Sequence, residues 1–298
     1  MKLLKFSLID WINLSFVFII FLFYLKAFPY TPYKIEPPLI FSFLIGLVLF
    51  AVYIRSNSSK KIKQIFLLSY PVIFLFVIFE TFFMILPYFN PMQYDNILNN
   101  IDFNMLGVYP TVWIEKFYNP IVSDILYLCY LFYFPMPLFL LVYLYRKKQM
   151  RDLDKVVFSY LSTYYISYVI YFFVPAMGPR FNETLLPLQQ IKSLDGLFIS
   201  IPIQNLINFL EPNKFDAFPS LHSAILTTTM LSTYIYHKKL FKIFIPVAIG
   251  IFIALVYCRY HYVIDIIVGF LISITIFFLS RWLYEIIAKK TQIHPFVY

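Results

Sequence analysis

The chain has 298 residues, of which 61% are hydrophobic, 22% aromatic and only 13% charged. A soluble domain of this length needs more polar surface, so the composition excludes an ordinary soluble protein and indicates a membrane protein. The formal net charge of +9 does not indicate nucleic-acid binding, because the basic residues stand in short clusters between apolar runs. Such clusters are typical of cytoplasmic loops.

The apolar runs predict an all-α protein with about eight transmembrane helices. Each run approaches or exceeds the roughly 20 residues that a helix needs to cross the hydrocarbon. The first run follows Lys2 and Lys5, and it is too long for a signal peptide and lacks a small-residue cleavage site. We therefore expect a retained anchor. The predicted spans are 11–28, 37–54, 64–87, 121–145, 156–175, 219–237, 240–258 and 262–284.

The basic residues also predict the orientation of these spans. Most of the 24 Lys and Arg residues fall at the two ends of the chain and in alternate loops, on one side of the membrane. The positive-inside rule then places both termini in the cytoplasm, which agrees with an even number of spans. Two long loops, 88–120 and 176–218, lie on the outer side. In the first loop, Pro110 is expected to open a short helix that Trp113 anchors at the interface.

The first polar group of interest is the segment Asp216–Ala224, which opens the sixth predicted span. Pro219 is compatible with the start of a helix, where backbone N–H groups have no partner within the helix. Together with the Ser220 hydroxyl, such a helix start is a natural cradle for an anion. His222 follows directly behind it.

The second group is the segment Cys258–Asp265, which opens the eighth predicted span. His261 and Asp265 are four residues apart and so share one helix face. Arg180 follows the fifth span, which also exits to the outer side. The predicted topology thus gathers His222, His261, Asp265 and two arginines at one membrane depth.

These side chains suit reactions of phosphate esters. A neutral imidazole attacks phosphorus when a carboxylate holds its other ring N–H, as Asp265 can do for His261. His222 is the candidate acid that protonates the leaving oxygen. Charge on the phosphoryl oxygens requires fixed donors, for which the candidates are Arg180, Ser220 and Arg259.

Each feature also has a simpler interpretation. An isolated His-xxx-Asp pair is often a structural hydrogen bond, a Pro-Ser pair is usually a helix cap, and Arg180 alone could snorkel at the interface. A metal site formed by His222, His261 and Asp265 is an alternative, although neighbouring arginines suit phosphate better than a cation. A transporter is another, although transporters usually bind substrate near the bilayer midplane.

The residues resemble the type 2 phosphatidic acid phosphatase superfamily, and within it the inositol phosphorylceramide synthase (inositolphosphotransferase) branch. The resemblance rests on Phe218–Ala224, on His261–Asp265 and on the segment ending Gly178-Pro179-Arg180, which occur in the expected order. It covers roughly residues 64–285, as a six-helix core. It implies an active site on the non-cytoplasmic face, no metal or other cofactor, His261 as the nucleophile that becomes phosphohistidine, Asp265 as its orienting partner and His222 as the proton donor.

The chain departs from the phosphatase pattern at three positions. Phe173 stands where the pattern has Lys, and Ala254 and Leu255 stand where the third motif has basic or polar residues. We expect Arg259 to replace part of this lost charge. These departures favour the transferase-like branch over a simple phosphatidate phosphatase.

The sequence therefore predicts a multi-pass lipid phosphatase or phosphotransferase, with two transmembrane helices in 1–63, a core in 64–285 and a cytoplasmic tail in 286–298. Its partners are expected to be a lipid phosphate or phospholipid substrate, an alcohol acceptor and membrane lipids, with no nucleic acid. Whether water or an alcohol accepts the phosphoryl group depends on how well the folded site excludes water, which is a property of the tertiary structure.

Overall fold

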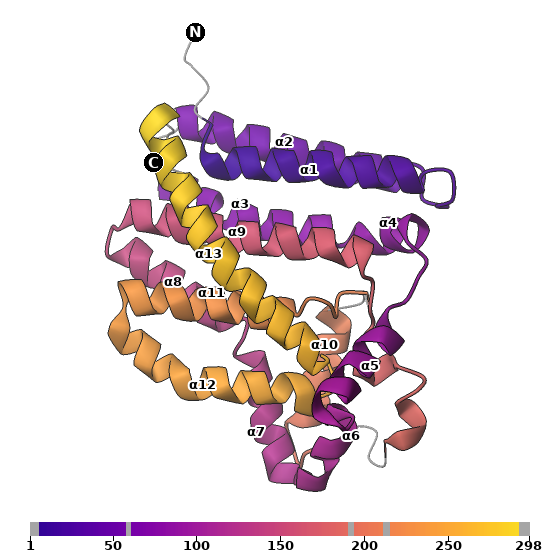
Figure 1. The fold of residues 1–298 in the computed structure, drawn as a ribbon. Coiled ribbons are helices and arrows are strands. Elements are labelled where there is room, and N and C mark those ends of the chain that lie inside the picture. The colour runs from indigo at the N-terminus through magenta and orange to yellow at the C-terminus, as the bar shows by residue number, and fades with distance from the viewer. Residues whose placement is uncertain (1–5, 58–60, 190–193, 211–214, 292–298) are drawn as a thin grey trace. The chain divides into compact units, whose positions relative to one another are not determined.

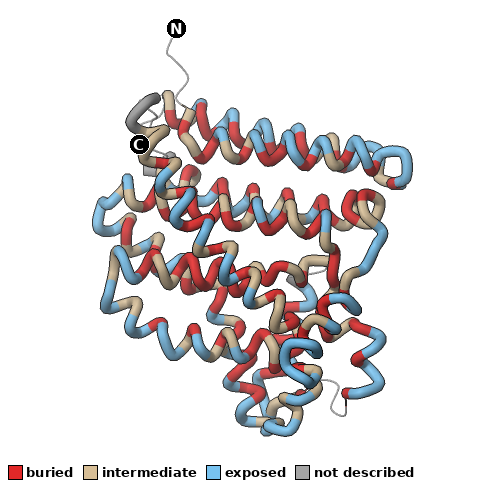
Figure 2. The backbone as a smooth tube through the Cα atoms, viewed as in Figure 1, coloured by how far each residue is buried: buried red, intermediate tan, exposed pale blue. Residues whose placement is uncertain are grey.

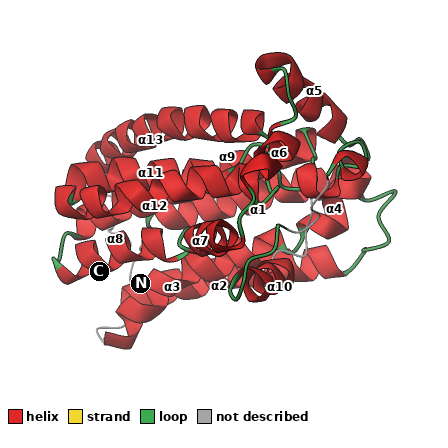
Figure 3. Cartoon of the chain, turned by 90° about the horizontal axis from the view of Figure 1, so that it is seen from below, coloured by secondary structure: helices red, strands yellow, loops and turns green. Residues whose placement is uncertain are grey.

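The computed structural model describes residues 6–57, 61–189, 194–210 and 215–291. Over these residues the chain consists of helices and loops, with one isolated β-bridge between Ala176 and Asp216 and no extended strand (Figure 3). The predicted all-α class is thus confirmed. The helices are clustered in two compact units, which are described separately.

The first unit contains residues 1–91, 144–165 and 278–298 (Figure 1). Helices α1, α2, α3 and α4 belong to it entirely, and α1 packs against each of the other three. A buried cluster links three of these helices, because Asp10 on α1 accepts hydrogen bonds from Arg55 on α2 and from Tyr70 on α3. The bounds are α1 Leu8–Ala27, α2 Glu36–Asn57, α3 Lys61–Phe79 and α4 Phe82–Phe89.

The second unit contains residues 92–143 and 166–277. Its complete helices are α5 Asp95–Leu106, α6 Pro110–Trp113, η1 Ile114–Phe117, α7 Pro120–Leu131, η2 Pro179–Phe181, η3 Leu186–Leu188, α10 Ser200–Leu210, α11 Leu221–Tyr236 and α12 Lys238–Tyr257. Three further helices contribute residues to both units: α8 Pro135–Arg146, α9 Met150–Phe173 and α13 Val263–Thr291. Within the second unit α12 packs against α7 and α11.

The long helices expose large apolar side chains, as lipid-facing helices do. Along α1 and α12 buried and exposed positions alternate (Figure 2), and the exposed positions include Phe18, Leu22, Ile249 and Ile253. Five helices among the described residues are long and apolar enough to cross a membrane, namely α1, α2, α9, α12 and α13. Two bent pairs bring the number to seven if each pair counts as one span.

The predicted count of eight spans is not confirmed, for two physical reasons. The predicted spans 64–87 and 121–145 are broken helices, bent by 45° between α3 and α4 and by 40° between α7 and α8. The predicted span 219–237 is α11, which has 16 residues. At 1.5 Å per residue such a helix covers about 24 Å, less than the roughly 30 Å of hydrocarbon.

Helix α11 is largely buried within its unit. Most of its side chains are buried, and its tube in Figure 2 is largely red. Its threonines satisfy their hydroxyls within the helix, since Thr227, Thr228 and Thr229 each donate to the carbonyl four residues earlier. A polar helix of this kind is stable only where neighbouring helices cover it.

The short helix predicted at Pro110 is confirmed. Helix α6 begins at Pro110, in the first-turn position where the missing N–H of proline costs nothing, and Trp113 at its end is exposed.

Candidate active site

The two histidines of the predicted site lie against each other. His222 is in the first turn of α11, and His261 lies in the connection between α12 and α13. Both rings are buried, and Nδ1 of His222 is 3.2 Å from Nε2 of His261. The topology predicted from sequence therefore brings this pair together.

Glycine at position 269 allows the helices behind the two histidines to approach closely. A Cβ atom at Gly269 on α13 would lie 2.3 Å from the carbonyl oxygen of Ser220. The backbone N–H of Ser220 also donates to the carbonyl of Asp265, at 3.0 Å. Close contact between the starts of α11 and α13 thus sets the separation of His222 and His261.

A backbone carbonyl orients His261. Nδ1 of His261 is 2.9 Å from the carbonyl oxygen of Ala217 and 3.6 Å from the nearer carboxylate oxygen of Asp265. That same oxygen of Asp265 accepts the backbone N–H of Tyr262, at 2.8 Å. The other carboxylate oxygen, Oδ1, accepts no hydrogen bond from the described part of the chain. Asp265 therefore lies beside His261, but Ala217 accepts the ring hydrogen bond.

These contacts assign the ring protons. The Ala217 carbonyl only accepts, so Nδ1 of His261 carries the hydrogen. Burial, and secondarily the charge of His222, lower the pKa of His261 well below its usual value, which keeps the ring neutral and leaves a lone pair on Nε2. Nδ1 of His222 then donates to that lone pair.

Tyr130 on α7 completes the chain of hydrogen bonds. Its hydroxyl is 2.7 Å from Nε2 of His222, and its ring packs against Tyr260 with centroids 4.7 Å apart. The direction of this hydrogen bond depends on which nitrogens of His222 carry protons. Tyr130 therefore holds the His222 ring with Nδ1 facing the proposed nucleophile.

Arg180 supplies positive charge near the histidines. Its guanidinium donates to the Tyr260 hydroxyl at 3.0 Å and to the side-chain oxygen of Gln204 at 3.4 Å. Its backbone N–H donates to the carbonyl of Arg259 at 3.0 Å. Both side-chain partners are uncharged, so they orient the guanidinium without neutralising it.

The other predicted phosphate ligands make different contacts. The guanidinium of Arg259 forms a buried ion pair with Glu115 on η1, and the two side chains are 2% and 7% exposed. Burial lowers the pKa of Arg259, and Glu115 opposes that shift. Ser220 is the N-cap of α11, where its hydroxyl accepts the N–H of Ser223 at 3.2 Å. Its role in phosphate binding stays a prediction, as does that of Arg259.

A small cavity opens beside the histidines. Its volume is about 50 Å³. Its walls are aromatic and apolar apart from the two histidines and two further polar residues, Asn208 on α10 and Asp216 in the loop before α11. The lining residues are Tyr130, Met177, Phe181, Ile207, Asn208, Asp216, Ala217, His222, Tyr260 and His261.

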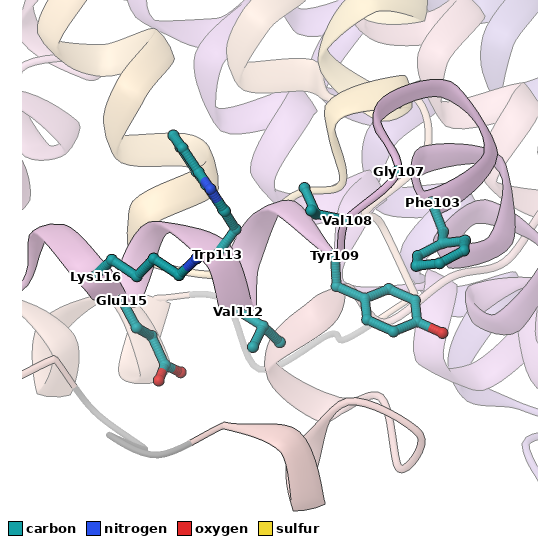
Figure 4. A pocket seen from close by; sticks show the side chains of 8 residues that line it. All are labelled: Phe103, Gly107, Val108, Tyr109, Val112, Trp113, Glu115 and Lys116. Atoms are coloured by element: carbon teal, nitrogen blue, oxygen red, sulfur yellow. The ribbon is translucent and has the colours of Figure 1, made fainter.

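A larger hollow of about 390 Å³ lies elsewhere in the same unit, on the segment that joins α5 to η1. Its walls include Phe103, Tyr109 and Trp113, with Glu115 and Lys116 at one end (Figure 4). It contains neither histidine. Among the described ranges, no three His, Cys, Asp or Glu side chains gather as metal ligands.

Sequence reasoning missed Tyr130 and Gln204. Tyr130 is one of 26 tyrosines and lies inside an apolar predicted span, with no motif around it. Gln204 belongs to α10, within a loop for which no helix was predicted. Only the packing of α7 against α10 and α12 brings these side chains toward the histidines.

Comparison with known proteins identifies the family of the chain. The chain is similar to a PA-phosphatase related-family protein of Dictyostelium discoideum, with 28% identity over 182 residues, 55% of this chain and 32% of that protein. It thus spans about a third of the length of this curated relative. No solved structure matches the chain. The sequence profile of the PAP2 superfamily matches residues 104–279, which include Arg180, both histidines and Asp265. This match covers more than half of the chain, and the chain therefore belongs to the PAP2 superfamily.

Proposed function

We propose that the protein is a multi-pass membrane enzyme that transfers a phosphoryl or phospho-headgroup from a lipid through a phosphohistidine on His261. The observation that carries the proposal is the contact between Nδ1 of His222 and Nε2 of His261, together with the Nδ1–H of His261 held by Ala217. In this arrangement the lone pair on Nε2 of His261 faces a proton on Nδ1 of His222. Family membership supports phosphate-ester chemistry on a lipid substrate.

In the first half-reaction, the phosphorus atom enters between the two rings. The lone pair on Nε2 of His261 forms the N–P bond as the P–O bond to the leaving alcohol breaks. The leaving oxygen takes a proton from Nδ1 of His222, which acts in its doubly protonated form and is left as a neutral imidazole. His261 keeps its Nδ1–H on the Ala217 carbonyl, and the Asp265 carboxylate 3.6 Å away offsets the positive charge that develops on the ring.

In the second half-reaction, the N–P bond breaks as an oxygen nucleophile attacks phosphorus. His222 removes the proton of that nucleophile, which restores both rings to their starting state. Arg180 binds the phosphoryl oxygens throughout, and it is held for this task by Tyr260 and Gln204.

The nucleophile of the second step is an alcohol on a lipid or polyol in this proposal, with water as the alternative. The cavity beside the histidines is about 50 Å³ and is lined by aromatic and apolar side chains together with polar ones. The departures at Phe173, Ala254 and Leu255 favour the inositol phosphorylceramide synthase-like branch.

The proposed setting is the outer face of a membrane, with both termini in the cytoplasm. The five to seven long apolar helices support a multi-pass protein, and the distribution of basic loops supports this orientation. In this proposal residues 64–285 form the catalytic core, the two helices in 1–63 are an addition to it, and 286–298 are a cytoplasmic tail.

The test uses the purified chain in vesicles that carry phosphatidate, an isoprenyl pyrophosphate or phosphatidylinositol, with and without ceramide. Free phosphate indicates hydrolysis, and a new phospholipid that forms only with ceramide indicates transfer. His261→Ala should abolish either product, whereas His237→Ala, which removes the side-chain cap of α12, should not. Equal activity in His261→Ala and wild type would refute the assignment of His261 as the nucleophile.

A second variant tests the acid. His222→Ala should slow the reaction more for lipids with poor leaving groups than for those with good ones, because only poor leaving groups need the proton. Equal slowing across leaving groups would remove His222 from this role.

A further inference from the structure

Helix α5 contacts both loops that carry the proposed catalytic groups. The carboxylate of Asp95 accepts the backbone N–H of Met177 at 2.9 Å and that of Gly178 at 2.8 Å. These residues directly precede Pro179 and Arg180. Asp95 also accepts the hydroxyl of Tyr262, the residue after His261, at 3.1 Å.

Asp102, two turns further along α5, caps the helix that follows His261. Its two carboxylate oxygens accept the backbone N–H groups of Val263 and Ile264, at 2.7 and 2.9 Å. These are the first residues of α13, whose own first turn leaves such N–H groups without partners. A carboxylate at this end of a helix is also favoured by the helix dipole. Asp102 thus fixes where α13 begins.

A third link joins the two loops directly. The hydroxyl of Tyr262 accepts the side-chain N–H of Asn182 at 2.8 Å, in addition to donating to Asp95. The Arg180 loop and the His261 connection are therefore tied to each other and to the same face of α5.

Hydrogen bonds act together with apolar burial in determining which face of α5 packs inward, because Leu98, between the two aspartates, is also buried in an apolar cluster with Tyr262. Asp95 and Asp102 are 8% and 0% exposed, whereas Ile97, Met105 and Leu106 are 51%, 47% and 49% exposed. An ordinary amphipathic helix buries its apolar side chains and exposes its carboxylates. Carboxylates are buried only where hydrogen bonds satisfy them, and here backbone N–H groups of the two loops do so.

Both aspartates lie before residue 104, where the match to the PAP2 superfamily begins. We propose that Asp95 and Asp102 are positioning residues for phosphoryl transfer, and that α5 holds the Arg180 loop and the start of α13 in register. This inference rests on the proposed function for its kinetic consequences. The two aspartates act on different groups, so their loss has different effects.

Asp95→Ala releases the loop that carries Arg180. Arg180 binds oxygens that are charged in both the substrate and the transition state, so KM should rise about tenfold or more with a smaller change in kcat. Asp102→Ala frees the start of α13 beside the nucleophile. Because a displacement of about 1 Å from attack geometry costs on the order of 100-fold, kcat should fall by 10-fold to 100-fold with a smaller change in KM.

The experiment measures kcat and KM of the full-length variants in vesicles of the lipid that wild type consumes, together with amide hydrogen exchange at residues 177, 178, 263 and 264. Asp95→Asn and Asp102→Asn keep one acceptor oxygen and should fall between wild type and alanine. Ser7→Ala removes the side-chain cap of α1, in the other unit, and serves as the control for loss of a cap. It should leave kcat, KM and these four amides unchanged.

The outcomes separate this inference from the proposed function. If wild type processes no phospholipid, the proposed function fails, and amide exchange alone decides whether α5 holds the loops. Unchanged exchange at all four amides in both alanine variants would overturn the inference. So would faster exchange with wild-type kcat and KM, or an equal loss of activity in Ser7→Ala.

Discussion

The hydroxyl of Tyr130 lies 2.7 Å from Nε2 of His222, on the side of the ring opposite to His261. His222 is thus held at both nitrogens, by the Tyr130 hydroxyl on one side and by the lone pair of the proposed nucleophile on the other. The orientation of the proposed acid therefore depends on a residue from another helix.

Tyr130→Phe should lower kcat/KM by about tenfold, because the ring of His222 loses the hydrogen bond that orients Nδ1 toward His261. The loss should be larger for lipids with poor leaving groups. The matched control is Tyr145→Phe, which removes a hydroxyl that donates to Gln64 at 2.8 Å in the other unit. Equal kinetics in Tyr130→Phe and wild type would show that His222 does not need this partner.

The pH dependence should report the neutral form of His261. Burial, followed by the charge of His222, lowers the pKa of His261 well below the usual value of about 6.5 for histidine. The nucleophile is the deprotonated ring, so the acidic limb of kcat/KM should lie below pH 6.5. The stability of the fold should also decrease as the pH falls below about 6.5, because His261 then binds a proton in the unfolded chain but not in the folded one.

This dependence is measured with a phosphodiester lipid, whose headgroup phosphate does not titrate between pH 5 and 8. The acidic limb should disappear from the small residual rate of His261→Ala. An acidic limb at or above pH 6.5 in wild type would contradict the neutral, buried nucleophile.

The Glu115–Arg259 pair separates a structural role of Arg259 from phosphate binding. Glu115→Gln leaves the Arg259 guanidinium buried without its carboxylate and should destabilise the protein by about 3 kcal/mol in thermal unfolding. The double variant Glu115→Gln with Arg259→Gln removes both charges and should recover much of that loss.

The kinetics of the double variant then distinguish a structural role of Arg259 from phosphate binding. If Arg259 only pairs with Glu115, KM for the lipid should return close to wild type once stability recovers. A KM that stays raised tenfold in a stable double variant would assign Arg259 to the phosphate, as its position beside the second histidine motif predicts.

Gly178 should tolerate no side chain. Its φ is +90°, which side chains disfavour, and a Cβ there would lie 2.5 Å from the carbonyl oxygen of Tyr260. Gly178→Ala should therefore destabilise the protein by about 1–3 kcal/mol and lower activity, since Tyr260 precedes His261. Gly46→Ala on α2 is the control, because a Cβ there meets nothing within 4 Å and alanine favours the helix. Equal melting temperatures would show that the loop relaxes without cost.

Much of the fold was predictable because apolar length and polar punctuation are local properties of the sequence. The helices at α1, α2 and α12 were predicted within three residues at each end for this reason, and the short helix at Pro110 was predicted too. For α9 and α13 one end was misplaced, by six and seven residues. The bends within 64–87 and 121–145 were not, because both halves of each pair are apolar and only packing decides where a helix breaks. The span predicted at 219–237 stays a prediction, because hydropathy does not distinguish a buried helix from a lipid-facing one and α11 has only 16 residues.

For the candidate site, too, some features follow from the sequence and others only from the tertiary structure. The residue types and their spacing predicted by themselves that His222, His261, Asp265 and Arg180 belong together, because the proposed phosphate transfer requires an imidazole pair, a carboxylate and a fixed cation. Only the tertiary structure decided the partners of these groups: Ala217 rather than Asp265 on Nδ1 of His261, Glu115 on Arg259, and Tyr130 on His222. Hydrogen-bond partners depend on distances of a few tenths of an ångström between distant segments, and those distances are set by helix packing rather than by any local pattern.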